Sequence, residues 1–353
     1  RMRKESLAFL KTLVTTPSPS GFEEQIQAVC KDYVKPYVDD VYKDVHGNQY
    51  AVRNPKGKLR VMLAGHVDEI GLMVNDIDEN GFLGFVAIGG IDPSVLDGQR
   101  IVVHGAAGPV PGVVGRTAIH LIEREERGKP LKLHQLWADI GAKDQKDAQS
   151  VAAIGDPITI DAGFVALRDN KVVARAFDDR IGAFVVLEAM RLIAKRDLPC
   201  AVYGVTTVQE EIGLRGATTS TYGCEPHAGI AVDVDHATDY PFVDARRFGR
   251  QKINAGPVIS RGPNINPIVN RQLLAVAKRH KIPYQVSAAP RATGTDANAM
   301  QLSRQGVATG LIGIPNRYMH SPVELLSLTD AEHAAQLIAE WVCSLSPKTS
   351  FIP

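Results

Sequence analysis

Consecutive apolar residues form four short runs along the chain, and segments with helical spacing of apolar positions separate them. Each run is too continuous for a strand with one face in water; they cover residues 59–64, 201–208, 229–234 and 306–314. Helical patterns follow, most clearly from Asp179 onward and over 266–280 and 329–345. This alternation predicts an α/β fold with a mixed, mostly parallel sheet covered by helices.

The segment from about residue 71 to residue 163 has a different character. It holds 14 of the 31 glycines and short strand-like runs such as FLGFVAI and QRIVVHG, with few helical periodicities. The dipeptide Asn80-Gly81 between two such runs is typical of a hairpin turn. We therefore expect a small β-barrel-like domain at 71–163, inserted into one discontinuous domain made of 1–70 and 164–353.

Charge and cysteine content narrow the classes of partner and compartment. Lys and Arg number 40 against 39 Asp and Glu, so a net charge of +1 gives no sign of a nucleic-acid or membrane partner. The four cysteines are scattered, which favours buried thiols in a reducing compartment and a cytoplasmic location. Lys11 interrupts the first apolar stretch, so we expect an amphipathic helix there rather than a signal peptide.

Residues able to bind metals or transfer protons collect at the ends of the predicted strands. They are His66 after the first run, Glu210 and Glu211 after the second, Asp233 in the third, His320 after the fourth, and Asp178 just before the long helix. Ligands of open α/β sheets bind beyond the carboxyl ends of the strands. The pattern thus predicts one convergent site.

Two imidazoles and three carboxylates without a thiolate suit zinc, cobalt or manganese. Five protein ligands exceed the number that one catalytic zinc usually takes, so we expect two divalent ions that share Asp178. Glu211 is then a ligand, and its neighbour Glu210 stays free as a general base beside a metal-activated water. Asp68 is placed to accept the other N–H of His66 and so to orient that ring.

Several of these residues have simpler interpretations. The pair Asp178-Asp179 would also arise as a helix cap, a role that we assign to Asp179 alone. His236 is an alternative ligand if the register differs, and Asp296 receives no role. Ser20 and Glu23 have the spacing of a capping box that begins a helix.

The chain also resembles the dinuclear metallo-aminopeptidases of the tetrahedral, glutamyl and deblocking type. The resemblance covers essentially the whole chain, in order: SGFE (20–23), AGHVDEIGLMV (64–74), IGGID (88–92), LWADIGAKD (136–144), RAFDDRIGA (175–183), VQEEIGLRGA (208–217), DVDHATDYP (233–241), GTDANAM (294–300) and YMHSPVE (318–324). Two positions depart from the family pattern. Asp235 stands where a threonine is usual, and Phe242 stands where a glycine is common.

The resemblance implies a zinc-peptidase-like fold and assigns the ligands to two ions. One ion would be held by His66, Asp178 and Asp233, and the other by Asp178, Glu211 and His320, with Glu210 as the catalytic base. It further implies that the inserted domain makes dimer contacts. Members of this family commonly form hollow dodecamers, which restrict substrates to short, unfolded peptides.

Three functions compete at this stage. The first is an aminopeptidase that removes the N-terminal residue of short peptides. The second is a related two-metal amidohydrolase or carboxypeptidase acting on acylated amino acids, which would not require a free α-amine. The third is a glycoside hydrolase of the endoglucanase type, for which paired carboxylates suffice, but that reading leaves His66, Asp233 and His320 without a role.

Overall fold

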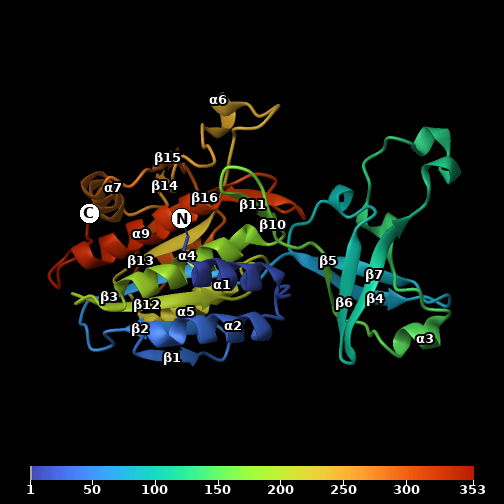
Figure 1. Cartoon of the computed structure of the whole chain (residues 1–353), viewed down its shortest axis with the longest axis horizontal. Coiled ribbons are helices and arrows are strands. Elements are labelled where there is room, and N and C mark those ends of the chain that lie inside the picture. Colours follow the sequence, from blue (N-terminus) through green and yellow to red (C-terminus); the bar gives the residue numbers. More distant parts are fainter. Residues whose placement is uncertain (1) are drawn as a thin grey trace.

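The computed structural model describes residues 2–353 and consists of a helix-covered sheet and a closed barrel that projects from it (Figure 1). In spatial order the large sheet contains β1 (Asp40–Lys43), β2 (Gln49–Arg53), β12 (Ala201–Thr207), β3 (Arg60–His66), β13 (Ala228–His236), β16 (Ala308–Asn316), β14 (Val258–Arg261) and β15 (Gln285–Ala288). The four central strands β12, β3, β13 and β16 are parallel, whereas β2 and β14 pair antiparallel with them. The predicted mixed, mostly parallel sheet is confirmed.

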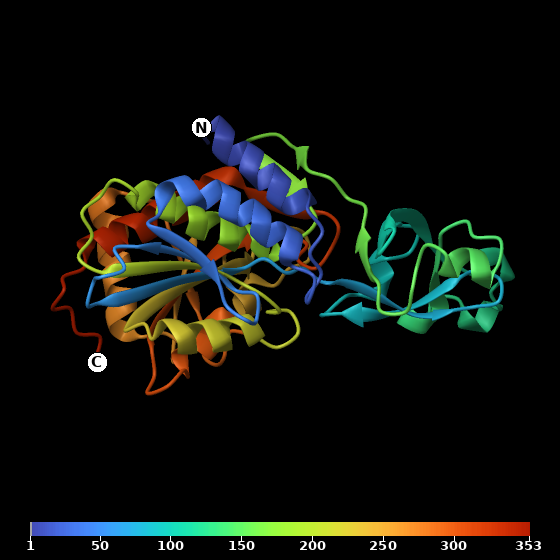
Figure 2. The same ribbon diagram turned by 90° about the horizontal axis from the view of Figure 1, so that it is seen from below.

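Helices cover both faces of this sheet (Figure 2). On one side lie α1 (Lys4–Thr15), α2 (Glu24–Val34), α4 (Phe177–Ile193), α7 (Pro267–His280) and α9 (Leu328–Ser344), and on the other lie α5 (Arg215–Cys224) and α8 (Asp296–Gln301). Along β3, Val61 and Leu63 enter the first core, and Met62 and Ala64 enter the second. Because alternate side chains point to opposite faces, a strand buried on both sides is apolar throughout.

The closed barrel contains β4 (Gly71–Ile77), β5 (Leu83–Ile88), β8 (Leu136–Asp139), β7 (Gly108–Arg116), β6 (Arg100–Gly105) and β9 (Pro157–Ile160), in that spatial order. It has its own hydrophobic core, including Leu72, Phe85 and Ile158. Gly81, with φ of +88°, lies in the turn between β4 and β5 at the predicted hairpin. The barrel-like insertion is thus confirmed, while the domain limits 71 and 163 remain a prediction.

Short elements complete the fold. They are α3 (Gln145–Gln149), α6 (Ala245–Phe248), the 3-10 helices η1 (Lys35–Tyr37), η2 (Pro93–Val95), η3 (Ile119–Leu121), η4 (Arg124–Glu126) and η5 (Leu133–Gln135), and the small sheet of β10 (Val165–Ala166), β11 (Lys171–Ala174) and β17 (Glu324–Ser327). The small sheet joins the chain leaving the barrel to the segment before α9. Among residues 2–353, no helix is both long and apolar enough to cross a bilayer.

Candidate active site

Six of the predicted site residues meet at one edge of the large sheet. His66 ends β3 and Asp233 lies near the end of β13, while Glu210 and Glu211 lie in the turn after β12. His320 follows β16, and Asp178 lies at the start of α4. The strands concerned are neighbours in the parallel part of the sheet, so their carboxyl ends bring these residues together, as the sequence predicts.

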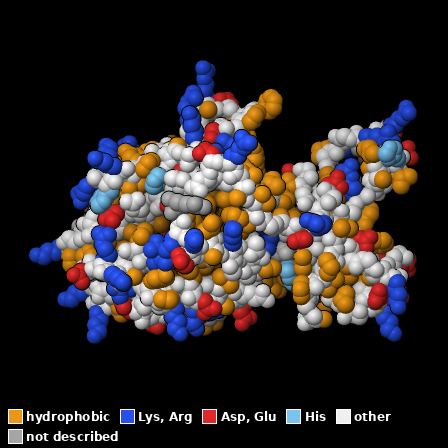
Figure 3. All heavy atoms as spheres, viewed as in Figure 1, with side chains coloured by type: hydrophobic (Ala, Val, Ile, Leu, Met, Phe, Trp, Pro, Cys, Tyr) orange, Lys and Arg blue, Asp and Glu red, His pale blue; other side chains and the backbone are white. Residues whose placement is uncertain are grey.

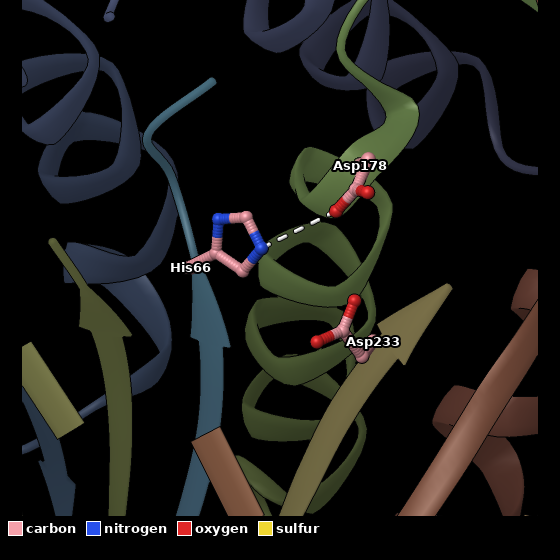
Figure 4. A group of neighbouring side chains, drawn as sticks. All are labelled: His66, Asp178 and Asp233. Carbon is pink, nitrogen blue, oxygen red and sulfur yellow. Dashed lines mark ion pairs between the residues drawn. The ribbon is translucent and has the colours of Figure 1, made fainter. Parts of the chain in front are cut away.

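The first group consists of His66, Asp178 and Asp233, which point toward one another (Figure 4). One ligand atom from each of the three lies within 4.8 Å of the others, and all three residues are buried. The Nε2 atom of His66 is 3.3 Å from Oδ1 of Asp178 and 3.6 Å from Oε2 of Glu210. Glu210 thus lies beside this group without belonging to either ligand triad.

The second group consists of Asp178, Glu211 and His320, whose ligand atoms also lie within 4.8 Å of one another. The Nε2 atom of His320 is 3.1 Å from Oδ2 of Asp178 and 3.5 Å from Oε1 of Glu211. The two oxygens of Asp178 therefore face different histidines, Oδ1 toward His66 and Oδ2 toward His320. A carboxylate in this arrangement can belong to two neighbouring ligand groups at once, with one oxygen in each.

The electrostatics of the cluster show an excess of buried negative charge. Burial and the charge of Asp233 raise the pKa of Glu210 to about 10, and burial raises the pKa of Asp233 itself well above its usual value. Contacts with carboxylates raise the pKa of His320 to about 11. Raised pKa values of both the carboxylates and the histidine show that this pocket favours positive charge, whether it comes from protons or from cations.

The residues present fit a pair of divalent cations. Within the described chain, the buried Oε1 atom of Glu211 accepts no hydrogen bond and has only the longer 3.5 Å contact with His320, although a buried carboxylate oxygen without a hydrogen bond is costly. Imidazole and carboxylate ligands without thiolate match zinc, cobalt and manganese. Cations would supply the charge that this donor set lacks.

Asp68 connects the first histidine to the two glutamates. Its Oδ1 atom lies 3.3 Å from Nδ1 of His66, which also contacts the main-chain oxygen of Asp68 at 3.1 Å. The same carboxylate accepts hydrogen bonds from the main-chain N–H groups of Glu210 and Glu211, at 3.0 and 3.2 Å. Asp68 is therefore placed both to orient the imidazole, as predicted, and to hold the glutamate turn, which was not predicted.

Glu324 is a supporting residue that the sequence reasoning missed. Its buried carboxylate accepts hydrogen bonds from the main-chain N–H groups of Asp178, at 2.8 Å, and His320, at 3.0 Å. His320 has a φ of +60°, a left-handed conformation that a non-glycine residue adopts only when its surroundings impose it. Glu324 falls within the segment YMHSPVE of the resemblance, which was the available signal.

The prediction of a capping box at Ser20 and Glu23 is wrong. The helix α2 begins at Glu24, and neither residue caps it through its side chain. Ser20 instead donates a hydrogen bond to Asp68 at 2.6 Å, and Glu23 accepts one from the main-chain N–H of Gln209 at 3.0 Å. Both residues thus support the site through partners that lie far away in the sequence.

The remaining candidates have definite positions. Asp179 accepts a hydrogen bond from the N–H of Gly182 and so caps the regular part of α4, as expected. His236 is exposed and belongs to neither ligand group.

Asp296 is buried and accepts a hydrogen bond from Thr207 at 2.5 Å. Phe242 is fully exposed with a φ of +66°, which is the conformation that a glycine would adopt freely.

A cleft of about 870 Å³ leads to the two groups. Its inner wall includes Asp178, Glu210 and Glu211, and a second wall includes Asp235 and Ser287. The rim contains four arginines: Arg246, Arg247, Arg250 and Arg291. The volume lies within the range of cavities that enclose a small ligand.

Fold and site together define an α/β protein with a buried carboxylate–histidine centre suited to divalent metal ions, and comparisons with known proteins agree with this class. The family model described as M42 glutamyl aminopeptidase matches residues 47–337. The lysyl aminopeptidase of Pyrococcus furiosus is 37% identical over 342 residues, covering 96% of this chain and 97% of that protein. The chain belongs to the M42 glutamyl aminopeptidase family, and this confirms the resemblance found in the sequence.

Solved structures give the same result. A TET aminopeptidase from the marine sediment archaeon Thaumarchaeota archaeon SCGC AB-539-E09 matches with a TM-score of 0.93 and 36% identity, and each chain is covered to 98%. The TET1 peptidase of Pyrococcus horikoshii, described as assembling into a tetrahedron or a large octahedral shell, matches with a TM-score of 0.87 and 29% identity over 96% of this chain and 100% of that one. Membership of a metallopeptidase family implies divalent metal ions, in agreement with the two ligand groups.

Proposed function

We propose that the chain removes the N-terminal residue from short peptides with two divalent ions, zinc first and cobalt or manganese as alternatives. One ion would be held by His66, Asp178 and Asp233, and the other by Asp178, Glu211 and His320. The single observation that supports this most strongly is the pair of ligand triads that share Asp178. When bound, such ions polarise a peptide carbonyl and lower the pKa of an attacking water.

The residues of the chain supply the proton transfer. The Glu210 carboxylate belongs to neither triad and lies 3.6 Å from His66. The positive charge of two bound ions would offset the burial that raises its pKa, so Glu210 would be ionised and able to accept the proton of the attacking water. It then donates that proton to the leaving amide nitrogen, which departs as an amine. Asp68 holds Glu210 in place through its main-chain N–H, and buried surroundings exclude bulk water from the carboxylate.

The alternatives fit the site less well. A glycoside hydrolase needs two carboxylates and no metal, which would leave both histidines and the shared Asp178 without a function. A two-metal amidohydrolase or carboxypeptidase would use the same centre, but it would not need the N-terminal amine of the substrate. Family membership favours the aminopeptidase.

Finer features of the function are also proposals. The similarity to a lysyl aminopeptidase, together with Asp235 in the cleft wall, supports a preference for basic N-terminal residues. The similarity to assembling TET peptidases supports a homo-oligomer, in which the barrel would make dimer contacts and dimers would build a hollow dodecamer. We also propose a cytoplasmic location.

The test is release of free amino acids from dipeptides and amino-acid amides, with and without added zinc. Wild type should act only with metal and only on substrates with a free α-amine. Glu210→Gln should retain two metal ions per chain and lose at least about 100-fold in kcat, since a positioned base contributes about 10² to 10⁴. Full turnover by this variant would remove Glu210 from its role, and cleavage of acylated substrates would favour the amidohydrolase.

A further inference from the structure

The inserted barrel contacts one of the two ligand groups and not merely its surroundings. We propose that residues 88–92, the last residue of β5 and the loop that follows it in the barrel, form part of the second metal site by orienting His320 and packing against Glu211. This inference rests on the metal ligands proposed above. It gives the barrel a role in metal binding, beyond the dimer contacts expected of it.

The first support is a hydrogen bond between the two domains. The Nδ1 atom of His320 lies 2.7 Å from the main-chain oxygen of Gly90. A carbonyl oxygen can only accept, so Nδ1 must be the donor and must hold the proton. In the neutral ring the lone pair is then on Nε2, the atom that faces Asp178 and Glu211. The barrel therefore selects the tautomer that a metal ligand requires.

The second support is the close approach of the loop to Glu211. Gly89 has a φ of +74°, and a Cβ atom added there would lie 2.8 Å from Cγ2 of Ile70 and 3.3 Å from Cβ of Glu211. A methyl group at position 89 would thus press on the Glu211 side chain or displace the loop from it. Only glycine allows the barrel backbone to run this close to the ligand.

The third support is the apolar packing beneath the second group. A cavity of about 30 Å³ beside Glu211 and His320 is lined in part by Ile91 and Ile158 of the barrel and by charged groups that include Glu69 and Arg175. The barrel thereby places hydrocarbon beside these two ligands, and a less polar surrounding strengthens electrostatic attraction to a cation.

The first group is supported differently. Nδ1 of His66 contacts Asp68, and all three ligands of that group come from β3, α4 and β13. A disturbance of residues 88–92 should therefore weaken the binding of one metal ion and leave the other unchanged. The two ions would differ in affinity because only one of them depends on the barrel.

Two glycines with the same φ give a matched pair of variants. Gly98 also has a φ of +74°, but a Cβ atom added there would meet nothing within 4 Å. Gly89→Ala and Gly98→Ala thus both place a side chain at a left-handed φ, but only the substitution at Gly89 adds a contact with Glu211. We expect Gly89→Ala to lower the affinity for one of the two zinc ions by about 10- to 100-fold, which is the usual effect of losing a hydrogen-bond partner of a metal ligand. Gly98→Ala should bind both ions as tightly as wild type does.

The measurements are calorimetric titration of the metal-free full chain with zinc and visible absorption of the cobalt-loaded protein. The inference would be overturned if Gly89→Ala bound each of the two ions as tightly as Gly98→Ala does. If wild type itself binds fewer than two ions, the proposed metal pair fails instead, so the two failures are distinguishable.

A second substitution tests the hydrogen bond without adding a side-chain atom, and it decides the question if Gly89→Ala does not fold. Replacing the Ile91 amide with an ester makes the Gly90 carbonyl a weaker acceptor. We expect weaker binding of the second ion and a changed cobalt spectrum. An unchanged second affinity with an unchanged spectrum would show that the carbonyl does not position His320.

Discussion

At the scale of single residues, two carboxylates connect the parts of the site. Asp178 presents one oxygen to His66 and the other to His320, so its loss would affect both ligand groups. Asp68 contacts His66 through its side chain and holds the main chain of Glu210 and Glu211. Because Asp68 contacts both the proposed ligand His66 and the proposed base Glu210, a shift of one of these residues would also move the other.

Asp235 leads to a prediction about substrate preference. It follows Asp233 by two positions on β13, so both side chains leave the strand on the same face. It is half-buried in the cleft wall, and no ion pair reaches it from the described residues. Its carboxylate has a hydrogen bond from Ser287 and lies near His236, but no Lys or Arg of the described residues pairs with it, so a cationic substrate side chain would gain about 1–2 kcal/mol there in a partly exposed setting.

We expect Asp235→Asn to lower kcat/KM for lysine and arginine amides about 10-fold relative to leucine amide. The ratio of these values in the variant and in wild type is the measurement. Thr293→Ala, which alters the lining of the same cleft without removing charge and whose hydrogen-bond partners are Asn264, Thr295 and Asn298, is the control. An unchanged lysine-to-leucine ratio in Asp235→Asn would exclude this residue as the source of the preference.

At the scale of elements, the turn after β12 must hold both glutamates in a conformation that the chain does not favour by itself. Gln209, just before them, has a φ of +55°, which costs about 1–3 kcal/mol for such a residue. Oε1 of Glu23 accepts hydrogen bonds from the N–H groups of Gln209 and Gly21, and Asn48 accepts one from Val208. The loop before α2 therefore stabilises the turn from outside.

Glu23 should make the stability of the fold depend on pH. Burial raises the pKa of Glu23 to about 7, so the folded chain holds this proton more tightly than the unfolded chain does. The resulting stabilisation is complete below the unfolded pKa, near 4.3, and is lost as pH rises to about 7. Glutamine stays neutral at every pH and retains the oxygen that accepts both hydrogen bonds.

We therefore expect Glu23→Gln to stabilise the fold relative to wild type, and the gain to grow by about 1–2 kcal/mol between pH 5.5 and 8.5. Urea unfolding of both proteins at the two pH values measures it. Glu24→Gln removes a carboxylate from the adjacent exposed position and should show no such trend. A gain that shrinks as pH rises would contradict the assignment.

The elements also mark what the sequence could and could not predict. His66, Glu210 and Asp233 were predictable because they follow apolar runs, and parallel strands collect such ends at one edge. Ser20 and Glu23 were misread as a capping box because local spacing cannot reveal a partner such as Asp68 or Gln209. Gly90 and Glu324 act through main-chain contacts between distant segments, which leave no periodic pattern.

At the scale of the whole molecule, the inserted segment has several large hydrophobic side chains on its surface. Large hydrophobic side chains at 82, 86, 113, 119, 121 and 154 are exposed on this segment. Figure 3 shows hydrophobic side chains on the visible face of the projecting barrel, among charges of both signs. Surfaces of this kind are typical of protein contacts. This supports the proposal that the barrel joins two copies of the chain.

Val86 on β5 and Val113 on β7 test that proposal, since both are nearly half exposed, at 42% and 46%. We expect the double variant Val86→Glu/Val113→Glu to dissociate toward monomer at micromolar concentration, because burying two carboxylates in an interface is costly. Sedimentation velocity measures the mass, and Leu302→Glu, at an 80% exposed site outside the barrel, is the control. All proposed ligands lie within one chain, so the dissociated variant should still bind two zinc ions. A mass equal to that of wild type would show that this face of the barrel is not the contact.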